Sequence, residues 1–591
     1  MPSLTDLGPD ILLPILSLLQ ATSPQTLHRS IALVNRQFRA LARSIRFYTL
    51  DFDSSDDAHV HGLFSALERE HLWHTVRTIM VSRTAGSGPA LDLLTTALPQ
   101  MTGLRDLHIA TNVIPAPLLD TLRTLPRIRL YAQVASSHRP RRPKPNTTPR
   151  ETNLQRLRAH PNLHALDVEA MYYKAADCRL VTGPLREILL TCVNLRMLRL
   201  CIAQPSGGCV IYGPTPEYCG FGFVDGEAPP PLEVLLLEDY PFGHEDSPPP
   251  SPNSNPGSDD DGDVEDSYYS KENQIGYPAP GSEIDYWAST FTWSSLRRLR
   301  IYHTDMVLHP SMLHQLTSLR EVEFTASLAA QRRFFASVPA SLERIRTRRF
   351  IDVGLTGLMR HGASLNRLEM HCAEDWRSKW LEAALVLDVD CLSVIGGRCP
   401  HLVDLELDLA REGGEWPFEA LEALASFPRL RTLTLWFELG VADGDHPVQP
   451  YVTFTSVDSL YKRMQGVREK LDLQPLRRLD VKAGAPPDVG RGLVAEEAFW
   501  PCYNSTAFRC VLGERDDEVA AGRYKIECTR LDERGNAILR QALESGEDPE
   551  EILDEEKWKG GQGGEGENVD REALRVAWYG PTPANQWEAH D

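Results

Sequence analysis

The chain has 591 residues, of which 42 % are hydrophobic and 24 % charged, a balance typical of a globular protein with about two to four domains. Its net charge is -20, but the acidity is concentrated in two segments: residues 245–285 hold eleven acidic residues against one lysine, and residues 484–591 hold 24 against 12 basic ones. The rest of the chain is nearly neutral and has no clustered basic face, so we expect no nucleic-acid partner.

The cysteine content and the apolar runs indicate a reduced, water-soluble protein. The chain has 11 cysteines, an odd number, with no CxxC pair and no His/Cys metal-ligand spacing. We therefore expect mostly buried thiols, no metal, no cofactor and a cytoplasmic or nuclear location. The apolar run 11–19 follows Asp6 and Asp10 without a basic residue, which is not typical of a signal peptide. No apolar stretch approaches the roughly 18 residues of a membrane span, so we expect no membrane association.

The first fifty residues predict three short helices. Asp10 is placed to cap the first helix, in which Ile11, Leu12, Ile15, Leu18 and Leu19 recur at helical spacing. The second is expected to start at Pro24. The third has one apolar face, made of Phe38, Leu41, Ala42 and Ile45. Helices this short bury little of their own apolar surface, so the module is expected to bind a partner.

These residues resemble the F-box family in the stretches LGPDILLPILSLL and IALVNRQFRALARSIRFYTLDF. Matches to the family pattern include Leu41, Ala42 and Arg36. Two departures are Gly8, between Leu7 and Pro9, and Phe38, where the family often has tryptophan. The resemblance implies docking on a Skp-type adaptor and through it on a cullin scaffold. The adaptor-binding residues would be Leu7, Pro9, Ile11, Leu12, Ile15, Leu33, Val34 and Phe38. Another interpretation of the module is a helical cap that closes the first repeat.

A repeated L-x-x-L-x-L pattern, with any large apolar residue allowed, follows the helical module and predicts the fold. Its units start at Val76, Leu104, Leu125, Leu163, Leu195, Leu232, Leu296, Leu319, Leu342, Leu365, Leu402, Leu430 and Leu476. The four starts from Leu296 to Leu365 are each 23 residues apart, which is typical of leucine-rich repeats. The stretches CVNLRMLRLC and CPHLVDLELDL resemble the cysteine-containing repeats that often follow an F-box.

Each unit is expected to form a strand, followed by a helix such as PFEALEALASF after Pro417. The predicted fold is α/β: a three-helix F-box-like module followed by a right-handed leucine-rich-repeat solenoid with a parallel concave sheet. The predicted domains are 1–50 for the module, 51–483 for the solenoid and 484–591 for an acidic, partly disordered C-terminal cap and tail.

Two segments within the solenoid have a different composition. Residues 138–150 are basic and rich in proline, so we expect an extended loop, with nuclear import as an alternative role. Residues from 245 to about 283 are acidic with few apolar side chains, so we expect a disordered insertion. Ser247 and Ser251 precede prolines there, and phosphorylation of this insertion is a possible form of regulation.

The predicted concave face carries bands of charge. Arg298, Glu321 and Arg344 are expected to pair across neighbouring strands. Further along, Arg348 faces no acidic residue, Glu406 meets Glu369, and Trp436 is expected to be exposed. Unbalanced charge beside an aromatic side chain favours a binding site for a protein substrate. The candidate substrate-binding residues are Arg344, Arg346, Arg348, Arg367, Glu369, Asp404, Glu406, Asp408 and Trp436.

No enzyme motif is found: the chain has no Gly-rich phosphate loop, HExxH, GxSxG or kinase signature, and we expect no catalytic residue. The resemblance implies a non-catalytic substrate-recognition subunit of a Skp-cullin-F-box ubiquitin ligase. One alternative is a leucine-rich-repeat scaffold or GTPase regulator without a ubiquitin role. Another is a repeat-bearing enzyme whose chemistry lies in residues 484–591.

Overall fold

The computed structural model describes most of the chain up to residue 484 and two later strands. The described residues are 9–22, 27–53, 56–82, 89–111, 114–137, 153–171, 175–203, 220–224, 226–238, 240, 242, 283–301, 304–324, 330–372, 387–411, 414–438, 448, 450, 452–484, 506–512 and 526–530. The predicted basic loop 138–150 lies outside them, as do nearly all of the acidic insertion and most of the tail. The described residues form two compact units, which divide between Leu296 and Arg297.

Unit 1 begins with short helices: α1 (Pro9–Thr22), the π-helix η2 (Leu27–Ile31), α3 (Ala32–Val34) and α4 (Arg36–Arg46). Helix α1 starts at Pro9, so Asp10 lies in its first turn rather than at its cap. Asn35 caps helix α4: its side-chain oxygen accepts a hydrogen bond of 2.8 Å from the backbone N–H of Phe38. Arg43 and Arg46 lie in its last turn, where positive charge stabilises a helix C-terminus.

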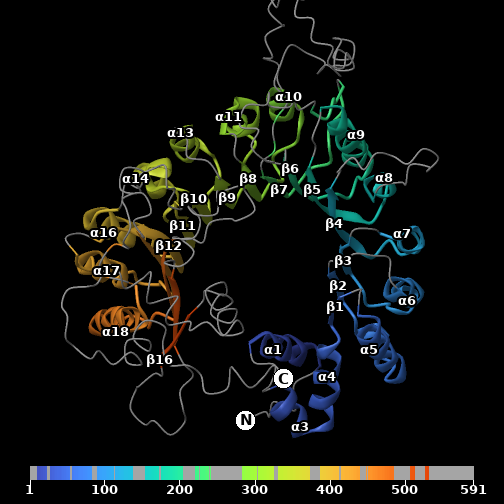
Figure 1. Cartoon of the computed structure of the whole chain (residues 1–591), viewed down its shortest axis with the longest axis horizontal. Helices are drawn as coiled ribbons and strands as arrows, with labels where there is room; N and C mark the ends of the chain where they lie inside the picture. Colours follow the sequence, from blue (N-terminus) through green and yellow to red (C-terminus); the bar gives the residue numbers. More distant parts are fainter. Residues whose placement is uncertain are drawn as a thin grey trace, which may run out of the picture. The chain divides into compact units, whose positions relative to one another are not determined.

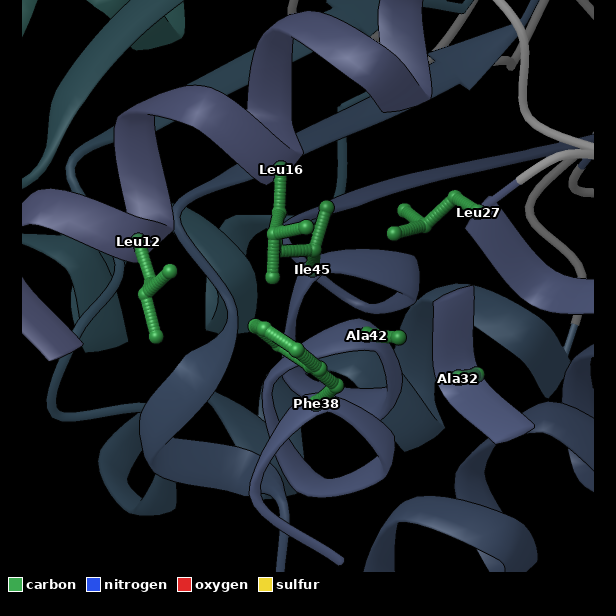
Figure 2. Packing of buried hydrophobic residues seen from close by; sticks show 7 residues of the cluster. All are labelled: Leu12, Leu16, Leu27, Ala32, Phe38, Ala42 and Ile45. Atoms are coloured by element: carbon green, nitrogen blue, oxygen red, sulfur yellow. The ribbon is translucent and has the colours of Figure 1, made fainter. Parts of the chain in front are cut away.

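One small hydrophobic core holds these helices together (Figure 2). Helix α1 contributes Leu12 and Leu16, and helix α4 contributes Phe38, Ala42 and Ile45; the cluster also contains Leu27 and Ala32. The predicted apolar face of the third helix is therefore the face that packs inward, with Leu41 only partly buried.

The rest of unit 1 alternates strands with helices. Its strands lie parallel in chain order: β1 (Thr49–Asp53), β2 (Thr78–Ser82), β3 (Asp106–Ala110), β4 (Arg129–Ser137), β5 (Leu163–Met171), β6 (Met197–Ala203) and β7 (Val234–Glu238). Its helices are α5 (Asp57–Arg69), η3 (Trp73–Thr75), α6 (Pro89–Ala97), η4 (Leu98–Gln100), α7 (Ala116–Arg123), α8 (Asn153–Leu157), α9 (Ala175–Thr191) and α10 (Glu283–Thr290). Helices α5 to α9 lie on one side of the strands (Figure 1).

Unit 2 repeats the arrangement. Its strands β8 (Arg298–Ile301), β9 (Glu321–Phe324), β10 (Arg344–Thr347), β11 (Arg367–Met370), β12 (Asp404–Leu409), β13 (Thr432–Phe437) and β14 (Arg478–Ala483) are parallel and follow chain order. Its helices are α11 (Thr304–Leu308), α12 (Pro310–Leu313), α13 (Ala330–Ser337), α14 (Phe350–His361), α16 (Val389–Arg398), α17 (Phe418–Ala425) and α18 (Phe454–Lys470). Helices α13 to α18 lie on one side of the strands (Figure 1).

The strand register is the one that the L-x-x-L-x-L pattern predicts. Leu368 pairs with Leu405, and Leu405 with Leu433, each the second apolar position of its unit. Every predicted start except Leu125 is buried. The α/β architecture with a parallel sheet in each unit is therefore confirmed.

The unit predicted to start at Leu125 is the exception, because its strand begins two residues later than the pattern implies. Leu107 pairs with Leu130 and Ile109 with Ala132, so Ile128 precedes the strand. The Asn162 side-chain amide donates hydrogen bonds of 2.9 and 2.8 Å to the carbonyls of Leu125 and Ile128. These bonds hold both residues in a turn, which the spacing of apolar residues does not reveal.

The acidic insertion is expected to end at about residue 283, and Glu283 itself is a packed residue. This glutamate is fully buried at the start of α10, although its composition groups it with the insertion. Its carboxylate accepts hydrogen bonds from the Tyr240 hydroxyl, at 2.9 Å, and from the backbone N–H of Phe221, at 3.3 Å. Glu283 therefore belongs to the packed part of unit 1.

Two strands beyond residue 484 extend the sheet of unit 2 in the opposite sense. Strand β15 (Thr506–Leu512) pairs antiparallel with β14, and β16 (Ile526–Arg530) pairs antiparallel with β15. Asp480 on β14 is buried and forms ion pairs with Arg478 at 2.9 Å and with Arg509 on β15 at 2.8 Å. The described part of 484–591 is thus a continuation of the sheet. Six cysteines with described side chains are free thiols, and four of them, Cys192, Cys372, Cys399 and Cys510, are buried.

Two buried histidines occupy equivalent places in the two units. In unit 2, the backbone N–H of Leu342 donates to His361 Nδ1 at 3.4 Å, so the ring must carry its hydrogen on Nε2, which lies 3.0 Å from the carbonyl oxygen of Phe335. In unit 1, Asn162 donates to His160 Nδ1 at 3.3 Å, and Nε2 lies 3.1 Å from the carbonyl oxygen of Leu119. Burial lowers the pKa of both imidazoles below 6.5, so both rings are neutral.

We predict that acidification destabilises both units through these histidines. The unfolded chain takes up protons near pH 6.5, whereas each folded ring resists protonation, so stability falls as the pH drops from 6.5 towards the lowered folded pKa. The loss is at most about 1.4 kcal/mol per pH unit for each histidine. Urea midpoints of the wild type, His160→Gln and His361→Gln between about pH 7.5 and pH 5.5 test this prediction. Identical pH profiles for all three proteins would contradict it.

Candidate functional site

The N-terminal helices expose apolar side chains that their own core does not use. Ile11, Ile15 and Leu18 recur along α1 and are 49 %, 45 % and 67 % exposed. Leu33 and Val34 on α3 are 65 % and 62 % exposed. Both groups belong to helices that pack against α4. Five large aliphatic side chains exposed within some 25 residues of sequence form a candidate contact surface for another protein.

The predicted adaptor-binding residues fall into three groups. Ile11, Ile15, Leu33 and Val34 are exposed. Leu12 and Phe38 are 0 % and 6 % exposed and belong to the core in Figure 2, so they support the helices and offer no contact surface. Leu7 lies outside the described residues, and Pro9 is described only as the first residue of α1. Leu18 was not among the predicted residues, although its spacing of three from Ile15 places it on the same side of the helix.

A second candidate surface is the strand face of unit 2, the side of strands β8 to β14 opposite the helices. Its residues are Arg298, Arg300, Glu321, Glu323, Arg344, Arg346, Arg367, Glu369, Asp404, Glu406, Asp408, Thr432, Thr434, Trp436, Arg478, Asp480 and Lys482. Strand alternation places these residues on one side and the core leucines on the other.

Strands β8 to β11 carry a lattice of ion pairs. Glu321 accepts from Arg298 at 3.4 Å and from Arg344 at 3.2 Å, as the sequence predicts. Two residues further along the same strand, Glu323 pairs with Arg300 at 2.6 Å and with Arg346 at 3.0 Å. Glu369 pairs with Arg346 at 3.1 Å and with Arg367. The lattice surrounds a hollow of about 140 Å³.

Trp436 is not the exposed aromatic side chain that the sequence predicts. The His371 ring stacks on it with centroids 3.7 Å apart and an interplanar angle of 11°, and Lys482 Nζ lies 4.3 Å from its centroid. Its Nε1–H donates a 2.6 Å hydrogen bond to Glu406. Trp436 is thus a packed, half-buried residue of the strand face, and the prediction that it is an exposed aromatic anchor is wrong.

A buried carboxylate fixes the orientation of His371. Asp408 Oδ1 lies 2.7 Å from His371 Nδ1, and Oδ2 accepts a 2.9 Å hydrogen bond from the backbone N–H of Cys372. Burial raises the pKa of the Asp408 carboxyl, and the hydrogen bond to His371 lowers it by a smaller amount. Burial also raises the pKa of the Cys372 thiol, which is therefore protonated at neutral pH. The arrangement holds the His371 ring against Trp436.

The remaining predicted irregularities of charge are only partly present. Glu369 and Glu406 do lie on paired positions of β11 and β12, but Glu369 is neutralised by two arginines and Glu406 accepts from Trp436. Arg348 is exposed and, among the described residues, has no carboxylate within ion-pairing distance; its Nη2 donates to Cys372 Sγ at 3.8 Å. Unbalanced positive charge therefore lies directly after β10.

Comparison with models of protein families and with curated proteins finds no match to this chain. Across the residues with described positions, no three His, Cys, Asp or Glu side chains gather as metal ligands do. None of the helices in the described segments has the length and apolar character needed to cross a membrane. The functional interpretation thus depends on the two surfaces above.

Proposed function

We propose that the chain is the substrate-recognition subunit of a Skp-cullin-F-box ubiquitin ligase. In this proposal the helices of residues 9–46 are an F-box module that docks on a Skp-type adaptor, and the strand-helix units are leucine-rich repeats that bind a protein substrate. The chain itself supplies no catalytic group, because ubiquitin transfer takes place on its partners.

The observation that carries the proposal is the exposed apolar row of α1, made of Ile11, Ile15 and Leu18. A helix that only capped the first repeat would turn its aliphatic side chains towards that repeat. Here α1 already has an inward face, with Leu12 and Leu16 in the core, and the row lies outside it. The spacing of four and three residues is that of a helix presenting one side to a partner.

The presence of two separate candidate surfaces, the apolar row of α1 and the strand face of unit 2, supports the same proposal. The apolar row belongs to the helical module, whereas the charged strand face of unit 2 lies on different elements. A receptor needs two such independent surfaces, one for the ligase and one for the substrate. A repeat scaffold without a ubiquitin role would need only the second.

Affinity purification of the tagged chain from cells, followed by mass spectrometry, tests the proposal. We expect a Skp-type adaptor and a cullin among the recovered proteins, and their loss when Ile11 and Ile15 are both replaced by aspartate. Recovery of neither protein with the wild type would favour a scaffold or GTPase regulator instead.

A further inference from the structure

The ion-pair lattice on strands β8 to β11 presents positive charge outward although it contains both signs. The arginines that line the hollow, Arg298, Arg344, Arg346 and Arg367, have side chains that are 46 %, 50 %, 57 % and 45 % exposed. The glutamates beneath them are less accessible: Glu321, Glu323 and Glu369 are 30 %, 14 % and 13 % exposed. The guanidinium groups therefore cover the carboxylates, and a partner meets arginine first.

These arginines have hydrogen-bond donors left over. Each guanidinium group has five N–H donors, whereas each of these side chains engages one or two carboxylates. Arg348, in the bend directly after β10, adds a cation with no carboxylate partner among the described residues. Arginine binds carboxylates through two parallel N–H bonds when its donors are accessible.

The arginines at β10 form a row on the strand face. Arg344 and Arg346 lie on β10, and Arg348 lies in the bend directly after it. All three are exposed and alternate with the buried Ile345 and Thr347. Alternate residues of an extended strand are about 6.6 Å apart, so an extended peptide lying over the strand face along β10 would present every second side chain at the same interval. We propose that this row binds an extended, carboxylate-rich segment of a partner protein in which acidic residues occupy alternate positions.

Charge favours carboxylates over phosphate groups as the ligand. The lattice holds five arginines, with Arg300 beside the four that line the hollow, against three glutamates, a net charge of +2, to which Arg348 adds one more. Singly charged carboxylates spread along the row match this small surplus. A dianionic phosphate would concentrate its charge near Glu321, Glu323 and Glu369, which repel it. The acidic residues of β12, including Asp404 and Glu406, confine an acidic partner to the β8 to β10 side.

The inference builds on the proposed function, since it names the class of substrate that the strand face would hold. It is tested separately, with the purified full-length chain and no adaptor present. The probe is a short fluorescein-labelled peptide in which glutamate alternates with serine, titrated by fluorescence anisotropy. We expect saturable binding that is about tenfold weaker in the triple variant Arg344→Gln, Arg346→Gln, Arg348→Gln, because three exposed pairs each contribute modestly.

The triple variant is designed to stay folded. Glu321 keeps Arg298, Glu323 keeps Arg300, and Glu369 keeps Arg367, so no carboxylate loses all of its partners. The matched control, Arg398→Gln, Arg429→Gln, Arg463→Gln, makes the same charge change at exposed positions near helices α16, α17 and α18. We expect this control to bind the peptide like the wild type.

Four results would overturn the inference. They are no binding of the alternating peptide, equal binding of a peptide with the same glutamates in one uninterrupted run, equal loss in the control variant, and clearly tighter binding of a phosphoserine version. Adaptor binding is measured on the same proteins. If the triple variant keeps the adaptor but not the peptide, the inference is supported; if the wild type binds the peptide but no adaptor, only the proposed ligase role fails.

Discussion

Replacing Ile11 and Ile15 by aspartate should abolish binding of the chain to a Skp-type adaptor while leaving the fold intact. Both side chains are about half exposed, at 49 % and 45 %, and neither belongs to the core of the helical module. In a complex, each aspartate would bring an unpaired carboxylate into an apolar contact, at a cost of several kcal/mol. This weakens binding by more than about 100-fold. Co-precipitation of the two purified proteins measures the effect.

The control for this variant also replaces two exposed aliphatic side chains by aspartate, but outside the helical module. Val193 and Val394 are 67 % and 40 % exposed and lie outside the helical module. The double variant Val193→Asp, Val394→Asp should co-precipitate the adaptor like the wild type. If the Ile11→Asp, Ile15→Asp protein is folded by circular dichroism and still co-precipitates the adaptor, the apolar row of α1 is not the docking surface.

Replacing Phe38 by alanine should also remove adaptor binding, but through the fold. Phe38 is 6 % exposed in a core of seven residues, and the loss of a buried phenyl ring costs about 3–5 kcal/mol. A core this small supplies little stability to spare, so the helices should open. Limited proteolysis of the full-length chain should then cut within residues 9–46 far faster than in the wild type.

The conservative variant Phe38→Leu distinguishes a role of Phe38 in packing the helical core from a role in direct contact with the adaptor. Leucine refills most of the cavity, so protease resistance and adaptor binding should both return towards the wild-type level. If Phe38 contacted the adaptor directly, Phe38→Ala would lose the adaptor while its helices stayed resistant to protease. We expect the Ile11→Asp, Ile15→Asp protein to lose the adaptor while its helices stay resistant to protease.

Sequence patterns predicted the repeat architecture well because strand alternation leaves a direct trace in the residues. Units with a full set of large apolar residues, such as Leu402, Leu405 and Leu407, are in the predicted register. The unit at Leu125 was displaced because a side chain from the next unit, Asn162, decides where its turn ends. Glu283 was assigned to the insertion because composition does not reveal that Tyr240 and Phe221 provide it with buried donors.

The candidate surfaces were harder to predict because they depend on which partner each side chain finds. Leu12 and Ile11 are neighbours in the same apolar run, yet one is buried and the other exposed, and only the packing of α1 on α4 decides between them. The position of Trp436 on its strand predicts an exposed aromatic side chain. Its stacking with His371 depends on how the buried Asp408 holds the imidazole, a contact between residues 37 apart.

Isothermal titration of the purified full-length chain with a purified Skp-type adaptor measures the proposed docking itself. We expect saturable binding of one adaptor per chain by the wild type and by the Val193→Asp, Val394→Asp control, and no measurable heat with the Ile11→Asp, Ile15→Asp variant. Absence of binding by the folded wild type, or equal binding by both variants, would contradict the proposed docking.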